Sequence, residues 1–496
     1  MEENKQPQYF SPVPPAVPKK PETFPAGKQE IVLGFLILIC SWFFFNSIYF
    51  GGFNIGAAVG LGGIILISTA YLLLKGHRLT IYTGTLLALD LVICGSFARS
   101  DDSFVKFIMV CFLIVSVNLG LCLLAGQNHR CPGGFSSVLD IPRTVFMLGV
   151  AKLDPSVRGL FQSLRSSGSA GKKGGAVLLG LVIAFPLLLI LIPLLTSADA
   201  AFDALLSKLP EIDLEEILVT LIFGTLLAVF FFVRATALQH AKKEDPAPQR
   251  RKGISAITVN TVLVAIAVVY GVYLVSQLAY FSGGFSGILP EDFTVAQYAR
   301  RGFFEMAWLC AINLAIIALS VGLVRGDAPK ATRLICLFIG IVTVFLAVSA
   351  SAKMFLYIGY FGLTRLRVLT QVIIFWLGLT TVLVCIWLFA PKLSYMKIAL
   401  ILALAMGAAV AWADVDTVVA RYNVKAYQTG KLETVDVEYL DSLGHGAVPY
   451  IAQLQADPDP EVANAAKRAM SRGYYINEDL RAWNYVNQIA KPYYDD

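Results

Sequence analysis

Long apolar runs, separated by short polar segments, repeat along most of this chain. Many of the runs are about 18 residues or longer, the length that a helix needs to cross a hydrocarbon core of about 30 Å. The chain is 57% hydrophobic and only 15% charged, whereas soluble domains carry about 25% charged residues. The pattern therefore predicts an all-α, polytopic bundle of about eleven membrane-spanning helices, over residues 31–50, 53–74, 79–97, 103–125, 174–196, 216–234, 254–281, 303–324, 334–359, 368–390 and 397–413.

Three polar regions flank or interrupt these runs. Residues 1–30 are rich in proline and charge, which is typical of a disordered tail. Residues 126–173 are too polar to span a bilayer, but they combine an apolar face with basic residues, as helices lying on a membrane surface do. We therefore divide the chain into a tail (1–30), an N-terminal transmembrane bundle (31–125), an interfacial segment (126–173), a C-terminal transmembrane bundle (174–413) and a small helical domain (414–496).

The last region predicts short amphipathic helices. Residues 447–454 and 457–470 resemble one helical pair of a HEAT-type repeat, with Pro449 at an early helical position. A third helix is expected over 478–490. Because solenoids need about three repeats to bury a core, we expect this domain to pack on its flanking helices or on the membrane bundle.

The distribution of lysine and arginine orients the spans. Basic residues gather around 75–78, in 126–173 and in 234–252, while the loops at the opposite ends are short or acidic. The positive-inside rule then places the N-terminus in the cytoplasm, and an odd number of spans places 414–496 outside it. The net charge of +6 reflects these orientation signals, so nucleic-acid binding is not expected. Residues 414–496 are themselves acidic, with 13 acidic and 8 basic residues, and contain no cysteine.

A sharp turn at 357–367 combines several unusual placements. Gly362 suits the left-handed position that ends a helix, and Thr364 can cap the next helix. Arg365 and Arg367 then fall in that helix's first turn, where the macrodipole disfavours cations. The orientation places them on the outer face, against the positive-inside bias. Two unfavourable placements so close together suggest an anionic partner.

The stretch 298–305 is the expected neighbour of this turn. On a helix, Arg301 and Glu305 lie four residues apart with Tyr298 on the same stripe. Acids beside this stretch would explain why the arginines are tolerated, either as a structural clasp between two helical hairpins or together with a bound anionic lipid or ligand. The candidate network comprises Arg365, Arg367, Tyr298, Arg300, Arg301, Glu305, Glu291 and Asp292.

Two charged residues fall inside predicted spans. Asp90 lies near the middle of its span, where an ionised carboxylate costs roughly 2.5–3.5 kcal/mol on insertion scales. It is either a proton or ion site, or a structural acid that is protonated or hydrogen-bonded. Lys353, like Lys106, lies near a span's outer end and can extend its ammonium outward. None of the four histidines has further ligands at a metal-site spacing, so we expect no metal and no cofactor.

The motif at 298–305, the turn at 362–367 and Arg421-Tyr-Asn423 resemble a bacterial membrane family, domain of unknown function 4173, which is close to 4153. The likeness covers about residues 170–496. Members often carry an acid near position 359 and Tyr at 361, where this chain has Gly359 and Phe361. The resemblance implies a multi-span protein of the bacterial cytoplasmic membrane and supplies no activity.

No catalytic motif is found, and we expect a non-enzymatic membrane scaffold or sensor. Its outer domain would contact an envelope protein, or anionic lipid at the outer face of the bilayer. One alternative is a permease or lipid translocator, for which Asp90 and the outer arginines would line the path. A membrane-embedded transferase is a weaker alternative. Polyprenyl-sugar transferases have a similar number of spans but place an acid in a long first outer loop, and in this chain that loop is short.

Overall fold

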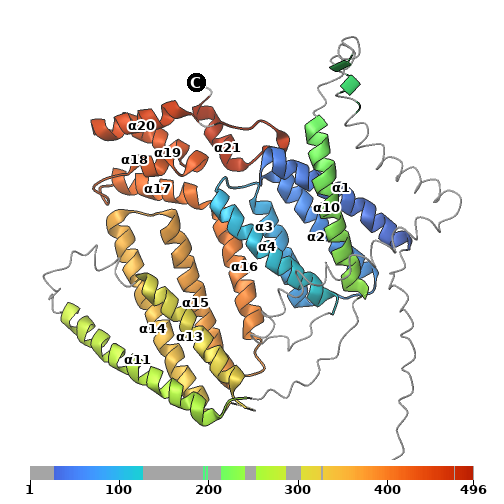
Figure 1. Ribbon diagram of the computed structural model, residues 1–496. Helices are drawn as coiled ribbons and strands as arrows, with labels where there is room; N and C mark the ends of the chain where they lie inside the picture. The colour runs from blue at the N-terminus through green and yellow to red at the C-terminus, as the bar shows by residue number, and fades with distance from the viewer. Residues whose placement is uncertain are drawn as a thin grey trace, which may run out of the picture.

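The computed structural model describes residues 27–126, 214–240, 253–285, 303–325, 328–473 and 475–494, with a few more between 191 and 198. Within these ranges every regular element is a helix, and the structure contains no strand there. The helices fall into two groups joined by one shared helix, and a layer of shorter helices crosses one end of the assembly (Figure 1). This confirms the predicted all-α helical bundle.

The first group contains the helices before residue 241. In it, α1 packs against α2 and α10, and α3 packs against α4. A second group follows, in which α14 is the central helix and packs against α11, α13 and α15. The helix α16 (Tyr395–Ala413) packs on both α3 and α15, and so connects the two groups. The bounds are α1 Lys28–Gly51, α2 Ile55–Leu74, α3 Ile81–Ser96, α4 Ser103–Leu124, α10 Leu214–His240, α11 Ala256–Phe285, α13 Phe303–Leu323, α14 Lys330–Phe361 and α15 Arg365–Phe389.

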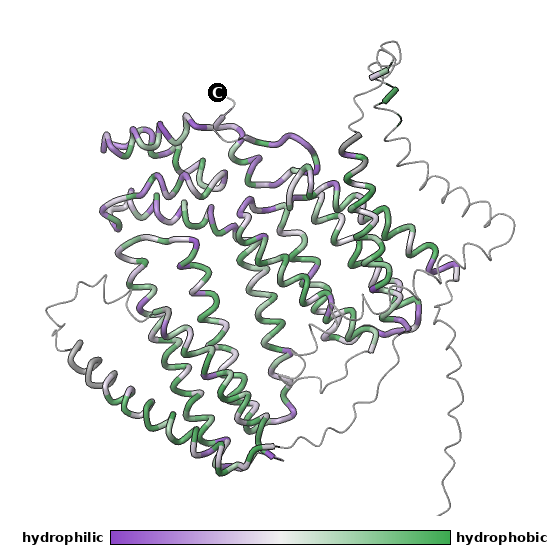
Figure 2. Tube along the Cα trace, viewed as in Figure 1, coloured by the Kyte–Doolittle hydropathy of each residue, from purple (hydrophilic) through white to green (hydrophobic). Residues whose placement is uncertain are grey.

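Nine of the helices in the described ranges are long and apolar enough to cross a membrane, and α3 is a shorter apolar helix. Together they account for ten of the predicted spans. The remaining predicted span, 174–196, lies almost entirely outside the described residues. Figure 2 shows hydrophobic residues along the bundle helices and more hydrophilic ones in the layer at their end. The chain is therefore a multi-pass integral membrane protein.

Several helices extend beyond the apolar runs that predicted them. The helix α15 begins at Arg365 instead of residue 368, and α14 begins at Lys330 instead of residue 334. Charged residues can occupy these end turns because their long side chains reach polar surroundings while the backbone stays helical. Hydropathy thus located the spans, whereas the helix ends depend on capping and on contacts with other segments.

The layer across one end of the bundle follows α16 directly (Figure 1). The chain turns at Asp414, which has φ 55° and is at once the C-cap of α16 and the N-cap of α17. The predicted helical pair is present as α19 and α20, although its HEAT-like character stays a prediction. The bounds in this layer are α17 Val415–Gln428, α18 Val437–Asp441, α19 Val448–Gln453, α20 Pro460–Arg472 and α21 Tyr485–Ala490.

The expected third helix, 478–490, is wrong as a single element. The structure has a short 3-10 turn at Leu480–Ala482 and then the separate helix α21. The break occurs because Asn484 is extended, with φ −141° and ψ 156°, and its side chain accepts a hydrogen bond from the Asn487 backbone. Asn484 thus acts as an N-cap in the middle of the predicted helix.

One apolar core continues from the first group of helices into the end layer. Buried side chains of α1, α3 and α4 contact those of α16, and the same cluster continues through α17 to α20. Representative members, in chain order, are Leu33, Leu86, Met109, Leu404, Val419, Leu440, Leu454 and Ala466. The end layer therefore packs directly onto the bundle, which agrees with the expectation that it does not bury a core alone.

Candidate functional site

The turn between α14 and α15 has the capping geometry that its sequence predicts. Gly362 follows α14 with φ 73° and ψ −178°, a backbone region open essentially to glycine alone. The Thr364 hydroxyl accepts a hydrogen bond from the Arg367 backbone N–H at 3.3 Å, and so caps α15. A Cβ at Gly362 would lie only 2.6 Å from Oδ1 of Asn423. Glycine is therefore required here both by its φ angle and by a close neighbour.

That neighbour ties the turn to the end layer. The Asn423 amide of α17 donates through Nδ2 to the Leu363 carbonyl at 2.8 Å and accepts from the Leu363 N–H at 2.7 Å. Both backbone groups of Leu363 are thereby satisfied at a point where no helix can satisfy them. The side chain of Asn423 is 8% exposed, so this paired amide is a buried, specific contact between α17 and the α14–α15 turn.

Arg367 lies in the first turn of α15 but directs its guanidinium to the end of α14. Its Nη1 donates to the Phe361 carbonyl at 2.9 Å and also to the Gly362 carbonyl. The guanidinium stacks over the Tyr357 ring at 4.4 Å. Because carbonyls at a helix C-terminus carry partial negative charge, Arg367 is stabilised there. The neighbouring helix end supplies the compensation that the sequence argument sought in an anion.

Arg365 is compensated by two carboxylates. Its Nε and Nη2 donate to Oδ1 and Oδ2 of Asp416, at 2.8 and 2.6 Å, in a bidentate pair. Oδ2 of Asp102 lies 2.9 Å from the same Nε but accepts no hydrogen bond from the described part of the chain, so its contribution is electrostatic. The Arg365 side chain is 30% exposed, while those of Asp102 and Asp416 are 1% and 4% exposed. The backbone N–H of Arg365 donates to the Tyr439 hydroxyl at 2.9 Å.

We call the set Ser100, Asp102, Arg365, Asp414 and Asp416 the Arg365 junction. Asp102 is the N-cap of α4 and accepts from two backbone N–H groups there. The Ser100 hydroxyl donates to Oδ1 of Asp414 at 2.9 Å. Burial raises the pKa of Asp416 to about 6, although Arg365 acts to lower it. Burial also raises the pKa of Asp414, against hydrogen bonds from Thr417 and Ser100. The junction therefore holds buried carboxylates close to one guanidinium.

A second polar contact lies on the side of the first helix group. Lys106 of α4 is 8% exposed and donates to Oδ1 of Asn54 at 2.7 Å. The same oxygen accepts from Nδ2 of Asn484 in the end layer at 3.2 Å. Lys106 thus extends its ammonium toward the end of the bundle that the end layer covers, where Asn54 offers a buried acceptor instead of solvent. Nearby, Nδ1 of His445 lies 2.7 Å from Oδ2 of Asp101.

Arg481 fixes the end layer to the first helix group. Its Nη1 donates to Oε1 of Glu216 in α10 at 2.7 Å and to Oδ1 of Asn46 in α1. Beside it, the Ile55 N–H donates to the Trp483 carbonyl at 3.2 Å. A Cβ at Gly51 would lie 2.9 Å from the Arg481 carbonyl carbon, so a glycine allows the two backbones to approach. Sequence reasoning missed Arg481, since nothing local to it indicates these partners.

The structure describes only three of the eight residues in the predicted network, Arg365, Arg367 and Glu305. The structure brings Arg365 and Arg367 to one turn, as expected. Glu305 is exposed at the start of α13, and among the described residues neither arginine forms an ion pair with it. The remaining predicted members, Tyr298, Arg300, Arg301, Glu291 and Asp292, lie outside the described residues. Sequence reasoning missed Asp102, Asp416 and Asn423. Two local signals could have indicated the acids, because Asp102 precedes a span at an N-cap position and Asp416 lies just after the last span.

The two intramembrane candidates have different surroundings. Asp90 of α3 is 0% exposed, and the Ser116 hydroxyl of α4 donates to its Oδ1. Among the described residues, its Oδ2 has no hydrogen-bond partner. Lys353 lies partly buried in α14. In the described residues no group of three or more histidine, cysteine, aspartate or glutamate side chains could hold a metal ion.

Comparison with known proteins places the chain in a family. No curated protein and no solved structure matches it. One family description, domain of unknown function 4153 (DUF4153), matches residues 32–454. The resemblance read from the sequence named 4173 first, with 4153 as its relative, and began near residue 170; the match instead includes the first helix group. Because this match covers most of the 496 residues, the chain belongs to the DUF4153 family.

Proposed function

We propose that this membrane protein is a non-enzymatic scaffold or sensor whose C-terminal helices contact a protein partner in the cell envelope. The observation that carries the proposal is the double attachment of the end layer. Arg365 pairs the second helix group with Asp416 of α17, and Arg481 of the end layer pairs with Glu216 of the first group. The layer thus links both groups.

The chemistry of these links suits a fixed platform. At the Arg365 link the acids are buried, and a buried charge left without its partner costs about 3–5 kcal/mol, so there the paired arrangement is strongly favoured over displaced ones. The paired amide of Asn423 adds directional hydrogen bonds to the same attachment. A partner that binds the end layer would therefore act on a surface whose position depends on both helix groups. Coupling of that kind is what a membrane sensor requires.

The end layer also exposes large apolar side chains after α20. Tyr475 is 87% exposed and Leu480 is 84% exposed. Exposed aromatic and aliphatic side chains are typical anchors in protein–protein interfaces. Further exposed members of this region are Tyr485, Ile489 and Tyr493. These residues are the surface that we assign to the partner.

Sidedness follows from the charge bias. We propose a bacterial cytoplasmic membrane location, with the N-terminus inside and the end layer outside. His77, which follows α2, lies 2.7 Å from Oε1 of Gln239 near the end of α10. These ends adjoin the basic segments 75–78 and 234–252, so the positive-inside rule supports one cytoplasmic end. A periplasm-active reporter fused after residue 496 should be active, and one fused within 241–252 inactive. The opposite pattern would overturn the location.

The partner surface can be tested in intact cells. A photo-crosslinking residue at Leu480 or Tyr475 should capture the same envelope protein. A crosslinker at Ile81, which is 92% exposed at the other end of the bundle, should not capture it. Arg481→Ala should reduce capture at normal protein level, because it loosens the layer. Equal capture from Ile81, or none from the end layer, would contradict the proposal.

A permease is the second candidate, favoured by one observation. Asp90 is fully buried inside the first helix group, and one of its carboxylate oxygens has no hydrogen-bond partner among the residues that the structure describes. Such intramembrane acids can carry protons or ions. If so, Asp90→Asn should abolish complementation of a deletion strain while membrane yield and thermal stability stay normal. Full complementation by Asp90→Asn would remove this candidate.

A further inference from the structure

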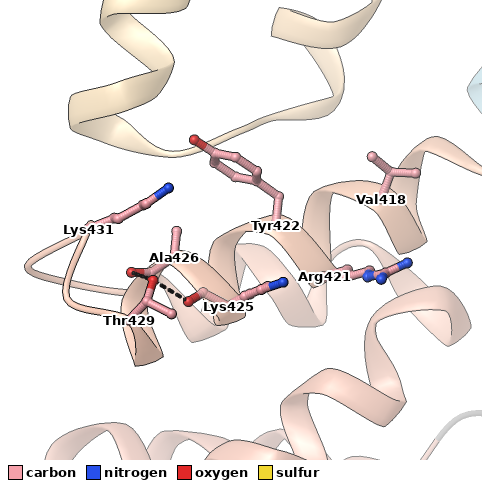
Figure 3. Close-up of a pocket in the computed structure, with 7 residues that line it drawn as sticks. All are labelled: Val418, Arg421, Tyr422, Lys425, Ala426, Thr429 and Lys431. Atoms are coloured by element: carbon pink, nitrogen blue, oxygen red, sulfur yellow. Dashed lines mark hydrogen bonds between the residues drawn. The ribbon is translucent and has the colours of Figure 1, made fainter.

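A basic pocket lies on α17, a helix whose contacts with the bundle were described above. It has a volume of about 370 Å³ and is lined by Val418, Arg421, Tyr422, Lys425, Ala426, Thr429 and Lys431. Figure 3 shows Tyr422 and Lys431 pointing toward the turn between α14 and α15, with Arg421 and Lys425 extending along α17. Arg421, Lys425 and Lys431 therefore line the same pocket as the Tyr422 ring.

The end of α17 brings the third cation to the other two. Gly430 has φ 70°, and the Lys431 N–H bonds back to the Ala426 carbonyl at 2.8 Å, the six-to-one bond of a Schellman motif. The Thr429 hydroxyl also donates to the Lys425 carbonyl at 2.9 Å. The chain after α17 is thus folded back on the helix, which holds Lys431 beside the pocket.

Among the described residues, no acid forms an ion pair with these cations. Residues 417–432 contain Arg421, Lys425 and Lys431 and no aspartate or glutamate, although residues 414–496 as a whole are acidic. All three side chains are exposed, and within the described part of the chain none has an ion-pair partner. Arg365 and Arg367, only a short distance away across the turn, are fully compensated. Among the described residues near this turn, the pocket therefore holds positive charge that no acid compensates.

Its position matches the headgroup level of a bilayer. The helix α17 runs across the ends of α14 and α15 (Figure 1). At the end of α14, Tyr360 and Phe361 are 59% and 50% exposed, as aromatic residues at membrane–water interfaces are. On α17, Val418 and Tyr422 are 40% and 38% exposed beside the cations. A helix that combines exposed apolar residues with lysine and arginine is suited to the interface plane.

We propose that this pocket binds the phosphate-bearing headgroup of an anionic phospholipid from the adjoining leaflet. The guanidinium and the two ammonium groups would contact the phosphate oxygens, and Tyr422 with Val418 would contact the glycerol and upper acyl region. Charge complementarity selects an anionic lipid over a zwitterionic one, because the pocket contains no acid to match a choline or ethanolamine group. The inference does not depend on the proposed scaffold function or on which leaflet is involved.

The test uses the full chain in nanodiscs of phosphatidylcholine containing a fraction of phosphatidylglycerol. Retained phosphatidylglycerol is counted by native mass spectrometry after release into detergent. Surface cations each contribute about 1 kcal/mol to binding anionic lipid, so Arg421→Gln with Lys425→Gln should weaken retention roughly 25-fold. A matched control exists on α20, where Lys467→Gln with Arg468→Gln removes one lysine and one arginine that are also exposed. This control should leave retention unchanged.

The outcomes separate the possible sources of the anion. If only the α17 variant (Arg421→Gln with Lys425→Gln) loses retained phosphatidylglycerol, and its melting temperature is unchanged, the result supports the headgroup site. Equal loss in the α20 control would mean nonspecific attraction, and no loss in either variant would mean no site; both overturn the proposal. In nanodiscs without phosphatidylglycerol, millimolar inorganic phosphate or glycerol 3-phosphate should neither bind nor stabilise the protein. Binding of these soluble anions, abolished by the α17 variant, would replace the lipid by a free phosphate ligand.

Discussion

The Arg365 junction and the α17 pocket lie on either side of one turn, yet they use positive charge in opposite ways. At the junction the cation is held between carboxylates that are 1% and 4% exposed. In the α17 pocket the three cations are exposed, and residues 417–432 contain no acid. Charge at the junction is thus part of the packing, whereas charge in the pocket is accessible from outside.

This contrast shows that an unusual charge in a sequence is not by itself a binding site. Arg365 and Arg367 stand out because they break local preferences, and the fold satisfies both through neighbouring groups. Arg421 and Lys425 break no rule of helix position and do not stand out. They become notable only when the structure shows which acids are absent around them. The expected results below would separate the two regions by stability, in order of decreasing effect.

The largest loss of stability is expected for Arg365→Ala. It leaves the buried Asp102 and Asp416 without their shared cation, and breaking a buried pair in this way costs about 3–5 kcal/mol. The free energy of unfolding in mixed micelles measures the change. Arg365→Lys should fall between wild type and Arg365→Ala, because it keeps the charge but loses the bidentate geometry. A change below about 0.5 kcal/mol for Arg365→Ala, the range of ordinary surface substitutions, would contradict a structural junction.

The junction should also make stability depend on pH. The pKa of Asp416 is raised by burial to about 6, from its ordinary value of 3.8, so between these values the folded state binds more protons than the unfolded state. Stability must then fall as pH rises from about 4 to about 6. One pKa unit corresponds to about 1.4 kcal/mol, so the fall is at most about 3 kcal/mol. Unfolding measured between pH 4.5 and 8 tests this.

Asp416→Asn is the control for that pH dependence. The amide keeps the shape of the side chain but cannot titrate, so the dependence should become flatter. Asp414, whose pKa is also raised by burial, should leave a residual slope of the same sign. If the stability of the wild type instead rises with pH across this window, Asp416 is stabilised as an ion and its pKa is not raised by burial. That result would contradict this prediction.

A smaller effect is expected at Arg367, which is compensated by carbonyls rather than by acids. Arg367→Gln removes the cation from the end of α14, and such helix-end charges with their hydrogen bonds contribute about 1–2 kcal/mol. A double-mutant cycle that combines Arg367→Gln with Tyr357→Leu should show a coupling energy, because the guanidinium stacks on the Tyr357 ring. Additive effects in the cycle would mean that the stack contributes nothing. Glu305→Arg should not restore stability to a charge-reversed Arg367, since the two are not paired here.

The smallest effect is expected on α17. Arg421→Gln with Lys425→Gln should change the free energy of unfolding by less than about 0.5 kcal/mol, as surface substitutions without partners do. The same detergent unfolding assay measures it beside the Arg365 variants. A loss comparable to Arg365→Ala would mean that the pocket is part of the packing, and the contrast between the two regions would disappear.

Much of the fold could be predicted because it depends on local properties of the chain. A run of apolar residues crosses a bilayer whatever its neighbours are, so ten of the expected spans appear as helices near their predicted positions. The caps at Gly362 and Thr364 were also predictable, since a positive φ and a side-chain oxygen before a helix are local requirements. The break at Asn484 was missed because distant segments hold the extended backbone there. The Trp483 carbonyl accepts a hydrogen bond from the Ile55 N–H, and the Tyr485 N–H donates to the Ala98 carbonyl.

The partners of the charged residues were decided only by the tertiary structure. Arg365 binds Asp416, 51 residues further along the chain, and Asp102, which caps a helix of the other group. Sequence reasoning required an anion for Arg365 and searched among the acids in and beside the 298–305 stretch, Glu305, Glu291 and Asp292. Which helix ends meet, however, depends on the packing of all spans together. A buried charge is stable only beside the group that this packing brings to it, and no local pattern contains that information.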